Sequence, residues 1–348
     1  MSNQRKNKKK QVLPIIPFIV LGLALVAVVV AIMKFKDDTA LAESSDISGV
    51  VDASESSSET LTPLTATDDE IYNVDQMTAD GVEALDASQY ADMAAVIEET
   101  MADFGVSAED ISLVYTNLQT NETYTVNEDS YMTAASTVKV PLATVIIDAI
   151  EAGDMTWESP VTYAYEDYEE GDGTITAAVA SGTGQATYTI EELMGESLMH
   201  SDNTATNMLI DYYETVYGEG AFRSNIVAEV YDQVGDIDEA IYEDSIASAN
   251  FLTAYYKLIS TNEIYQPILD FLLQTSPDRL FTTYVKSSVM ANKYGNYGTA
   301  LNDTGIYYEN DEAQYSLVVY TDGLTEGEDF LANLNLRVNE YYRATYGE

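Results

Sequence analysis

The sequence has no cysteine, one histidine and few basic residues. The absence of cysteine excludes disulfide bonds, a catalytic thiolate and cysteine-ligated zinc. A single histidine, His200, excludes a histidine-rich metal site and argues against a Ser-His-Asp triad. We therefore expect neither a metal ion nor any other cofactor.

The charge is strongly one-sided, with 15 basic against 59 acidic residues and a net charge of −44. Seven of the basic residues lie in the first 36 positions, which contain no acid. The remaining 312 residues carry 8 basic and 59 acidic side chains, a net charge of −51. Binding to nucleic acid needs clustered Lys and Arg that neutralise phosphates, so this composition excludes a nucleic-acid partner.

An uncharged run of 22 apolar residues spans positions 12–33, and about 20 residues of helix are enough to cross the hydrocarbon of a bilayer. The five basic residues in positions 1–11 favour a cytoplasmic amino end, which would put the rest of the chain outside the cell. A cleaved signal peptide is the alternative, because Ala40-Leu41-Ala42 is typical of a cleavage site. The length of the run favours a retained transmembrane helix.

The composition changes twice after this span. Residues 34–86 are acidic and rich in Ser and Thr with few large apolar side chains, which predicts a solvated linker. Residues 87–348 contain regular apolar periodicity, which predicts one folded domain with an adequate core.

Within this domain the pattern predicts strands at both ends and helices in the middle, an α+β fold in which the first and last segments share one sheet. The predicted strands are residues 111–117, 123–126, 287–294, 299–308 and 315–321. The predicted helices are residues 87–104, 136–151, 189–217, 245–260, 262–275 and 327–346.

Ser136 and Lys139 begin an apolar helix, and positions i and i+3 are neighbours on a helix surface. Burial lowers the pKa of a lysine, and a neutral amine beside a serine hydroxyl activates it as a nucleophile. Only four lysines follow position 36, so one in an apolar helix is notable. The alternatives are a chance pairing and a lysine whose amine reaches the surface.

Two further motifs carry polar groups suited to acyl transfer. Ser201-Asp202-Asn203 lies between two helical segments, where Ser201 can relay a proton and the Asn203 amide can bind a substrate or Lys139, although such residues are also common helix caps. Lys293-Tyr294-Gly295 ends a predicted strand, where a cation can bind a carboxylate and a glycine allows close approach of a ligand. An edge-strand lysine followed by a turn is the alternative.

Taken together, Ser-x-x-Lys, Ser-Asp-Asn and Lys-x-Gly, in this order and 65 and 92 residues apart, resemble the serine β-lactamases of class A and the penicillin-binding proteins. The similar sequences around the motifs are YMTAASTVKVPLA, LMHSDNTATNMLID and MANKYGNYGTALNDTGIYY. The resemblance implies a β-lactamase/transpeptidase-like fold. This has a five-stranded antiparallel sheet flanked by helices, an all-helical lobe and an active site between the two.

The resemblance also implies a role for each motif residue in acyl transfer through an ester on Ser136. Lys139 would be the general base, and Ser201 would pass the proton to the leaving nitrogen. Asn203, Lys293 and Gly295 would bind the substrate. The backbone amides of Ser136 and Asn296 would form the oxyanion hole.

Two features depart from the family pattern. Tyr294 stands where Thr or Ser is usual, and we expect its bulk to alter or narrow the carboxylate pocket. No glutamate between Ser201 and Asn250 starts the Glu-x-x-x-Asn pattern that supplies the deacylation base, and Glu229 is the nearest candidate by position. The acidic residues 167–173 are expected to form a solvated loop that borders the active site.

The sequence thus predicts a membrane-anchored extracellular serine hydrolase that acts on β-lactams. Two alternatives remain open. One is a peptidase or acylated sensor of peptidoglycan peptides with slow deacylation, like a penicillin-binding protein. The other is a non-catalytic module that binds cell wall or protein. The oligomeric state is left undetermined.

Overall fold

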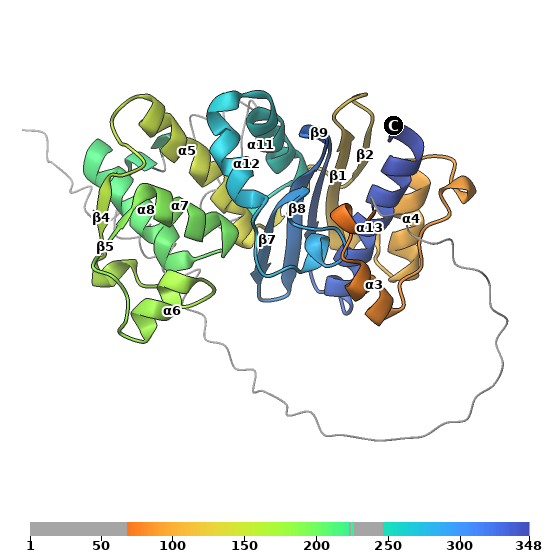
Figure 1. Cartoon of the computed structure of the whole chain (residues 1–348), viewed down its shortest axis with the longest axis horizontal. Coiled ribbons are helices and arrows are strands. Elements are labelled where there is room, and N and C mark those ends of the chain that lie inside the picture. The colour runs from red at the N-terminus through yellow and green to blue at the C-terminus, as the bar shows by residue number, and fades with distance from the viewer. Residues whose placement is uncertain (1–67, 223, 226–245, 348) are drawn as a thin grey trace, which may run out of the picture.

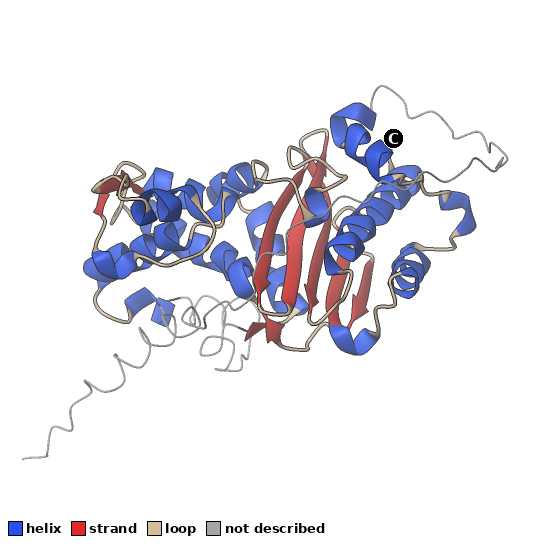
Figure 2. Ribbon diagram, turned by 90° about the horizontal axis from the view of Figure 1, so that it is seen from below, coloured by secondary structure: helices blue, strands red, loops and turns tan. Residues whose placement is uncertain are grey.

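The structure is a computed structural model that describes residues 68–222, 224–225 and 246–347. Five antiparallel strands form the central sheet in the order β2-β1-β9-β8-β7. The strands are β1 (Ile111–Asn117), β2 (Thr123–Val126), β7 (Met290–Tyr297), β8 (Ala300–Glu309) and β9 (Glu312–Thr321). The sheet lies between two groups of helices (Figures 1 and 2). β1 pairs with β9, so the first and last strands meet as predicted.

One face of the sheet is covered by α4 (Met93–Asp103) and the closing helix α13 (Gly327–Tyr346). Successive strand side chains point to opposite faces, so β1 contributes to two cores. Leu113 and Tyr115 pack in the core on the α13 side, whereas Val114 packs in the core on the other side. These two apolar cores fix the sheet between its helical layers.

The opposite face carries the other helices, several of which form a lobe to one side of the sheet (Figure 1). The helices are α5 (Lys139–Glu151), α6 (Thr174–Ala180), α7 (Ile190–Met199), α8 (Asn203–Tyr217), α11 (Ala249–Thr261) and α12 (Gln266–Leu272). Two small two-stranded sheets accompany them: β3 (Met132–Thr133) with β6 (Ile246–Ala247), and β4 (Pro160–Thr162) with β5 (Thr187–Thr189).

Short 3-10 helices connect these elements: η1 (Ala87–Gln89), η2 (Ala108–Asp110), η3 (Ala135–Val138), η4 (Tyr165–Asp167), η5 (Glu263–Tyr265) and η6 (Leu280–Thr282). The α+β prediction is confirmed, including the five-stranded antiparallel sheet and the helical lobe.

Part of the predicted linker 34–86 is folded, because the chain packs onto the domain from residue 68. Helices α2 (Asp68–Ile71) and α3 (Val74–Asp80) are joined by Tyr72 and Asn73, and Asn73 Nδ2 donates to Thr282 O of η6 at 3.0 Å. Ile71, Tyr72 and Met77 are buried in the core on the α13 side, and the Tyr72 hydroxyl donates to Asn339 Oδ1 at 2.7 Å. Burial of these three apolar side chains anchors the segment to the domain, although most of the residues around them are polar or acidic.

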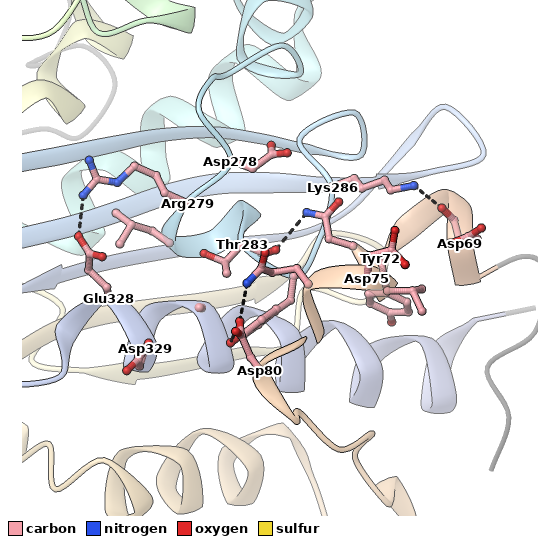
Figure 3. Close-up of a pocket in the computed structure, with 16 residues that line it drawn as sticks. Asp69, Tyr72, Asp75, Asp80, Asp278, Arg279, Thr283, Lys286, Glu328 and Asp329 are labelled. Carbon is pink, nitrogen blue, oxygen red and sulfur yellow. Dashed lines mark hydrogen bonds and ion pairs between the residues drawn. The ribbon is translucent and has the colours of Figure 1, made fainter. Parts of the chain in front are cut away.

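A pocket lies where this N-terminal segment meets residues 278–286 and α13 (Figure 3). Six of its sixteen lining residues are acidic, and Arg279 and Lys286 are the two cations among the sixteen. Arg279 is paired with Glu328 at 2.9 Å, and Lys286 donates to the backbone of Asp69. None of the predicted site residues lines this pocket, so it is separate from the site described below.

The described ranges contain no helix that combines the length and the apolar character needed to cross a bilayer. The predicted transmembrane run 12–33 and the linker up to residue 67 lie outside the described residues.

Met77 tests whether the N-terminal segment belongs to the domain. Met77→Ala should lower the free energy of unfolding by about 2–5 kcal/mol, because it opens a cavity in a packed core. The neighbouring exposed Gln76→Ala should change it by less than about 0.5 kcal/mol. Urea unfolding of the full chain in mild detergent measures both. Equal effects of the two substitutions would show that the segment is not part of the core.

Candidate active site

Ser136 lies in η3, at the turn that leads directly into α5. Helix α5 is apolar on nearly every side, so burial in the lobe core fixes its amino end. The residue before the serine, Ala135, has a φ of +49°, a strained conformation for a residue with a Cβ atom. Thr137 secures the turn by donating to Ala134 O at 2.8 Å and by pairing with the Tyr320 hydroxyl at 2.9 Å.

The Lys139 amine lies at the junction between α5 and α8. Lys139 is 4% exposed, and its Nζ donates to Ser201 O at 2.6 Å and to Asn203 Oδ1 at 2.8 Å, with a longer contact of 3.4 Å to Ser201 Oγ. Burial lowers the pKa of Lys139 to about 8, although the nearby charges of Glu169 and Asp202 raise it. Roughly one amine in ten is therefore neutral at pH 7.

The expected contact between Lys139 and Ser136 is not formed in this conformation. Every hydrogen bond recorded for the Lys139 amine in the described part of the chain goes to Ser201 or Asn203. The i, i+3 spacing places the two side chains on one side of the turn. The second motif then supplies better acceptors for the amine than a single hydroxyl. The structure therefore brings Ser201 and Asn203 to the Lys139 amine directly, whereas Ser136 lies one turn earlier without a hydrogen bond to it.

In the second motif, Asp202 joins two helices, whereas Ser201 and Asn203 contact the Lys139 amine. Ser201 is buried with a φ of +57°, and its carbonyl accepts from the amine. Asp202 begins α8 by accepting from the Ala205 amide at 2.8 Å, and its other oxygen accepts from the Ile175 amide at 2.7 Å. Asp202 therefore holds α6 and α8 together, which leaves Ser201 and Asn203 to face the site.

The third motif comes from β7, the edge strand of the sheet next to η3. A Cβ atom added at Gly295 would lie 2.8 Å from Ala134 O and 3.1 Å from the Ser136 amide nitrogen. Only glycine therefore lets β7 approach the nucleophile turn so closely. Asn296, the next residue, is exposed at this end of the strand.

Lys293 is fully buried on the same strand. Its Nζ donates to Tyr294 O at 3.1 Å and lies 4.4 Å from the centroid of the Tyr294 ring. Burial lowers the pKa of Lys293 well below its usual value, and the charge on Lys139 lowers it further, whereas Asp303 raises it. The two buried amines, on α5 and on β7, therefore lie close enough for the charge on Lys139 to act on Lys293.

The bulk of Tyr294 does not lie beside the Ser136 turn, where the sequence led us to expect it to alter or narrow the carboxylate pocket. Its ring is 2% exposed and packs in the core on the α13 side, with the Arg279 guanidinium 5.1 Å from its centroid. Alternation along β7 sends this ring to the opposite face from Gly295. The ring holds the Lys293 amine by a cation–π contact, where the usual hydroxyl would bind the carboxylate.

Comparison with known proteins places the chain in a family. The model of the beta-lactamase enzyme family matches residues 92–342. The chain belongs to this family. This membership identifies the protein as a serine hydrolase with a β-lactamase-like fold. No curated protein matches the chain.

Solved structures with the same fold include β-lactamases and a penicillin-binding protein. The β-lactamase from Sphaerobacter thermophilus has a TM-score of 0.58 at 20% identity, covering 73% of this chain and 95% of its own. PBP-A has a TM-score of 0.57 at 19% identity, covering 72% and 95%. An ancestral class A β-lactamase, GNCA, has a TM-score of 0.57 at 18% identity, covering 70% and 99%.

One residue beside the site was missed by the family motifs. Glu169 lies in the loop 168–173, and its Oε2 accepts from Asn207 Nδ2 at 3.0 Å. Burial raises the pKa of Glu169 to about 7, although Asn207 and Lys139 lower it. The loop does border the site, as expected, but it is not simply solvated, because Asp167 is buried and Glu169 half-buried. Glu229, the predicted deacylation candidate, lies outside the described residues.

The two loop glycines were a usable signal. A Cβ atom at Gly171 would lie 2.5 Å from Asn203 Nδ2, and one at Gly173 would lie 2.1 Å from Asp202 Oδ2. Gly171 and Gly173 in this acidic segment were therefore the sign that the loop packs closely against Asp202 and Asn203.

The pH dependence of the reaction at Ser136 tests Lys139 as the base. The rate of covalent labelling by a reactive acyl donor should rise with pH and level off above about 8, because only the neutral amine accepts the proton. Lys139→Arg should abolish this rise, since a guanidinium stays charged. The exposed Lys257→Arg is the matched control and should keep the wild-type profile. A wild-type rate that does not change between pH 6 and 9 would contradict the assignment.

Proposed function

We propose that the protein accepts the acyl group of a β-lactam on Ser136 and then hydrolyses the resulting ester. One observation carries the proposal: a buried Lys139 amine, held by Ser201 and Asn203, lies one turn after a serine in a family of serine hydrolases. A structure of the PBP-A L158E mutant, which shares the fold, is described as an acyl-enzyme complex with penicillin G.

In the proposed acylation, neutral Lys139 takes the proton of the Ser136 hydroxyl as its oxygen bonds to the acyl carbon. The carbon–nitrogen bond of the lactam then breaks, and Ser201 passes a proton to the leaving nitrogen. The proton on Lys139 replaces the one given by Ser201 through their contact of 3.4 Å. Protons and bonds therefore balance without an external acid.

The substrate is bound by groups on both sides of the nucleophile. Lys293 attracts the substrate carboxylate, and Asn203 binds the substrate side chain. The backbone amides of Ser136 and Asn296 stabilise the oxyanion, a contribution of typically ~3–4 kcal/mol per donor. Gly295 supports this arrangement, because it lets the strand that carries Asn296 lie against the turn that carries Ser136.

A second candidate function is a peptidase or acylated sensor that responds to peptidoglycan peptides. It uses the same residues, and the absence of Glu-x-x-x-Asn between Ser201 and Asn250 favours it, because a missing base slows deacylation. A non-catalytic wall- or protein-binding module is the third reading.

A fluorescent penicillin and a chromogenic cephalosporin separate these functions. The full chain should carry the label on Ser136 and should open the cephalosporin ring repeatedly, and Ser136→Ala should lose both activities. Stable labelling without colour would favour the peptidase or sensor. A wild-type chain that neither forms an adduct with nor turns over either compound or a peptide thioester would leave only the binding module.

The proposed location is the outer face of a membrane, with the amino end in the cytoplasm. The uncharged run 12–33 and the five basic residues before it support this topology.

Because the chain has no cysteine, single introduced cysteines report its topology directly. In intact cells a membrane-impermeant maleimide should label Gln76→Cys on the domain, whereas Ser2→Cys should react only after lysis. Loss of the Ser2→Cys label from the mature chain would indicate cleavage. Protection of both positions in intact cells would contradict an extracellular domain.

A further inference from the structure

The loop 168–173 is fastened to the same helix that holds the catalytic amine. The Glu169 amide donates to Thr204 Oγ1 at 3.3 Å, and Asn203 Nδ2 donates to Glu170 O at 3.3 Å. Asn203 thus contacts the loop with its amide nitrogen and Lys139 with its amide oxygen, at 2.8 Å. The loop and the amine therefore share one rigid support.

The Glu169 carboxylate lies within this arrangement. Asn203 and Asn207 are four residues apart on α8 and therefore lie on one side of the helix. Asn203 holds the Lys139 amine, and Asn207 holds Glu169 Oε2 at 3.0 Å. No hydrogen bond from a described residue reaches Glu169 Oε1. One oxygen is therefore positioned, and the other is available to a water molecule.

The other acids near the site differ from Glu169 in their surroundings. The Oδ1 of Asp167 is buried with no hydrogen-bond partner among the described residues, but the charges that act on Asp167 are those of Asp211 and Glu166 and not that of Lys139. Asp202 binds backbone amides of α6 and α8, and Asp167 accepts from the Ala164 amide at 2.6 Å. Glu170 is exposed. Among the described acids of this loop and of the second motif, Glu169 alone is half-buried, held by one side-chain bond and close enough to Lys139 for its charge to act on that amine.

We propose that Glu169 is the general base that activates water to hydrolyse the ester on Ser136. This rests on the proposed acyl-enzyme function. Glu169 takes one proton from water as the water oxygen bonds to the ester carbon. The carbon–oxygen bond to Ser136 then breaks, the acid product leaves, and the proton returns to Ser136 Oγ through Lys139. The enzyme regains its starting protonation.

This assignment differs from the family pattern in its place along the chain. The family glutamate follows Ser-Asp-Asn, whereas Glu169 precedes Ser201 by 32 residues and enters from the loop before α6. No glutamate between Ser201 and Asn250 begins the family pattern. In this chain a carboxylate that precedes the Ser-Asp-Asn motif therefore takes the role that the family assigns to a glutamate after it.

Glu169→Gln is the sharp test, because glutamine keeps the shape and can still accept from Asn207 but cannot take a proton. Removing the negative charge also removes an influence that raises the pKa of Lys139, so acylation should be retained. The adduct with penicillin should form at a rate within about threefold of wild type and decay about 10²–10⁴ times more slowly. Glu170→Gln, the exposed neighbour, is the control and should match wild type in both steps.

Mass spectrometry of the full chain after rapid mixing measures both rates, and its outcomes distinguish the two proposals. The absence of both an adduct and turnover by wild type with penicillin, cephalosporin or peptide thioester would overturn the proposed function and this inference with it. Equal adduct lifetimes in wild type and Glu169→Gln would overturn the inference alone. Loss of adduct formation in Glu169→Gln would also overturn it, because Glu169 would then act in acylation. Equally slow adduct decay in Glu169→Gln and Glu170→Gln would overturn it too, because the effect would then come from the loop structure.

Discussion

The arrangement of the site depends on the burial of one amine. An ammonium group taken out of water is costly unless it is hydrogen-bonded, and the helix that carries Lys139 is apolar on nearly every side. The only groups recorded as accepting from it in the described chain belong to Ser201 and Asn203. The lobe must therefore dock α8 against α5 for the amine to be satisfied. The same requirement accounts for the strained positive φ of Ser201, whose carbonyl is one of the acceptors.

A second constraint comes from the unusual charge of the chain. After position 36 it has 8 basic residues, and two of them are buried amines in this site, on α5 and on β7. Burial is the main cause that lowers the pKa of both lysines, the charge on Lys139 lowers that of Lys293 further, and nearby carboxylates raise both. Behind the sheet, burial raises the pKa of Asp303 to about 7.

Much of the fold was predictable because its signals are local. The strands 111–117 and 123–126 and the helix 327–346 have the predicted bounds, since their apolar periods are regular and their ends are marked by turns. The errors arose where the deciding contact is distant in sequence. Tyr72 bonds to Asn339, and the Lys139 amine bonds to residues 62 and 64 positions away. The direction of the Tyr294 ring depends on which face of β7 the lobe covers, and the motif alone does not contain that information.

The same reasoning explains why an acidic loop became part of the site. Asp202 binds α6 and α8 at once, and Gly173 allows the loop to pass within contact of its carboxylate. Asn203 then joins the loop to the Lys139 amine, so the loop cannot shift without disturbing that amine. Glu169 on this loop is thereby held near Lys139 by Asn207. The tripeptide Ser201-Asp202-Asn203 thus fixes two titratable groups from separate segments, Lys139 and the loop that carries Glu169, relative to each other.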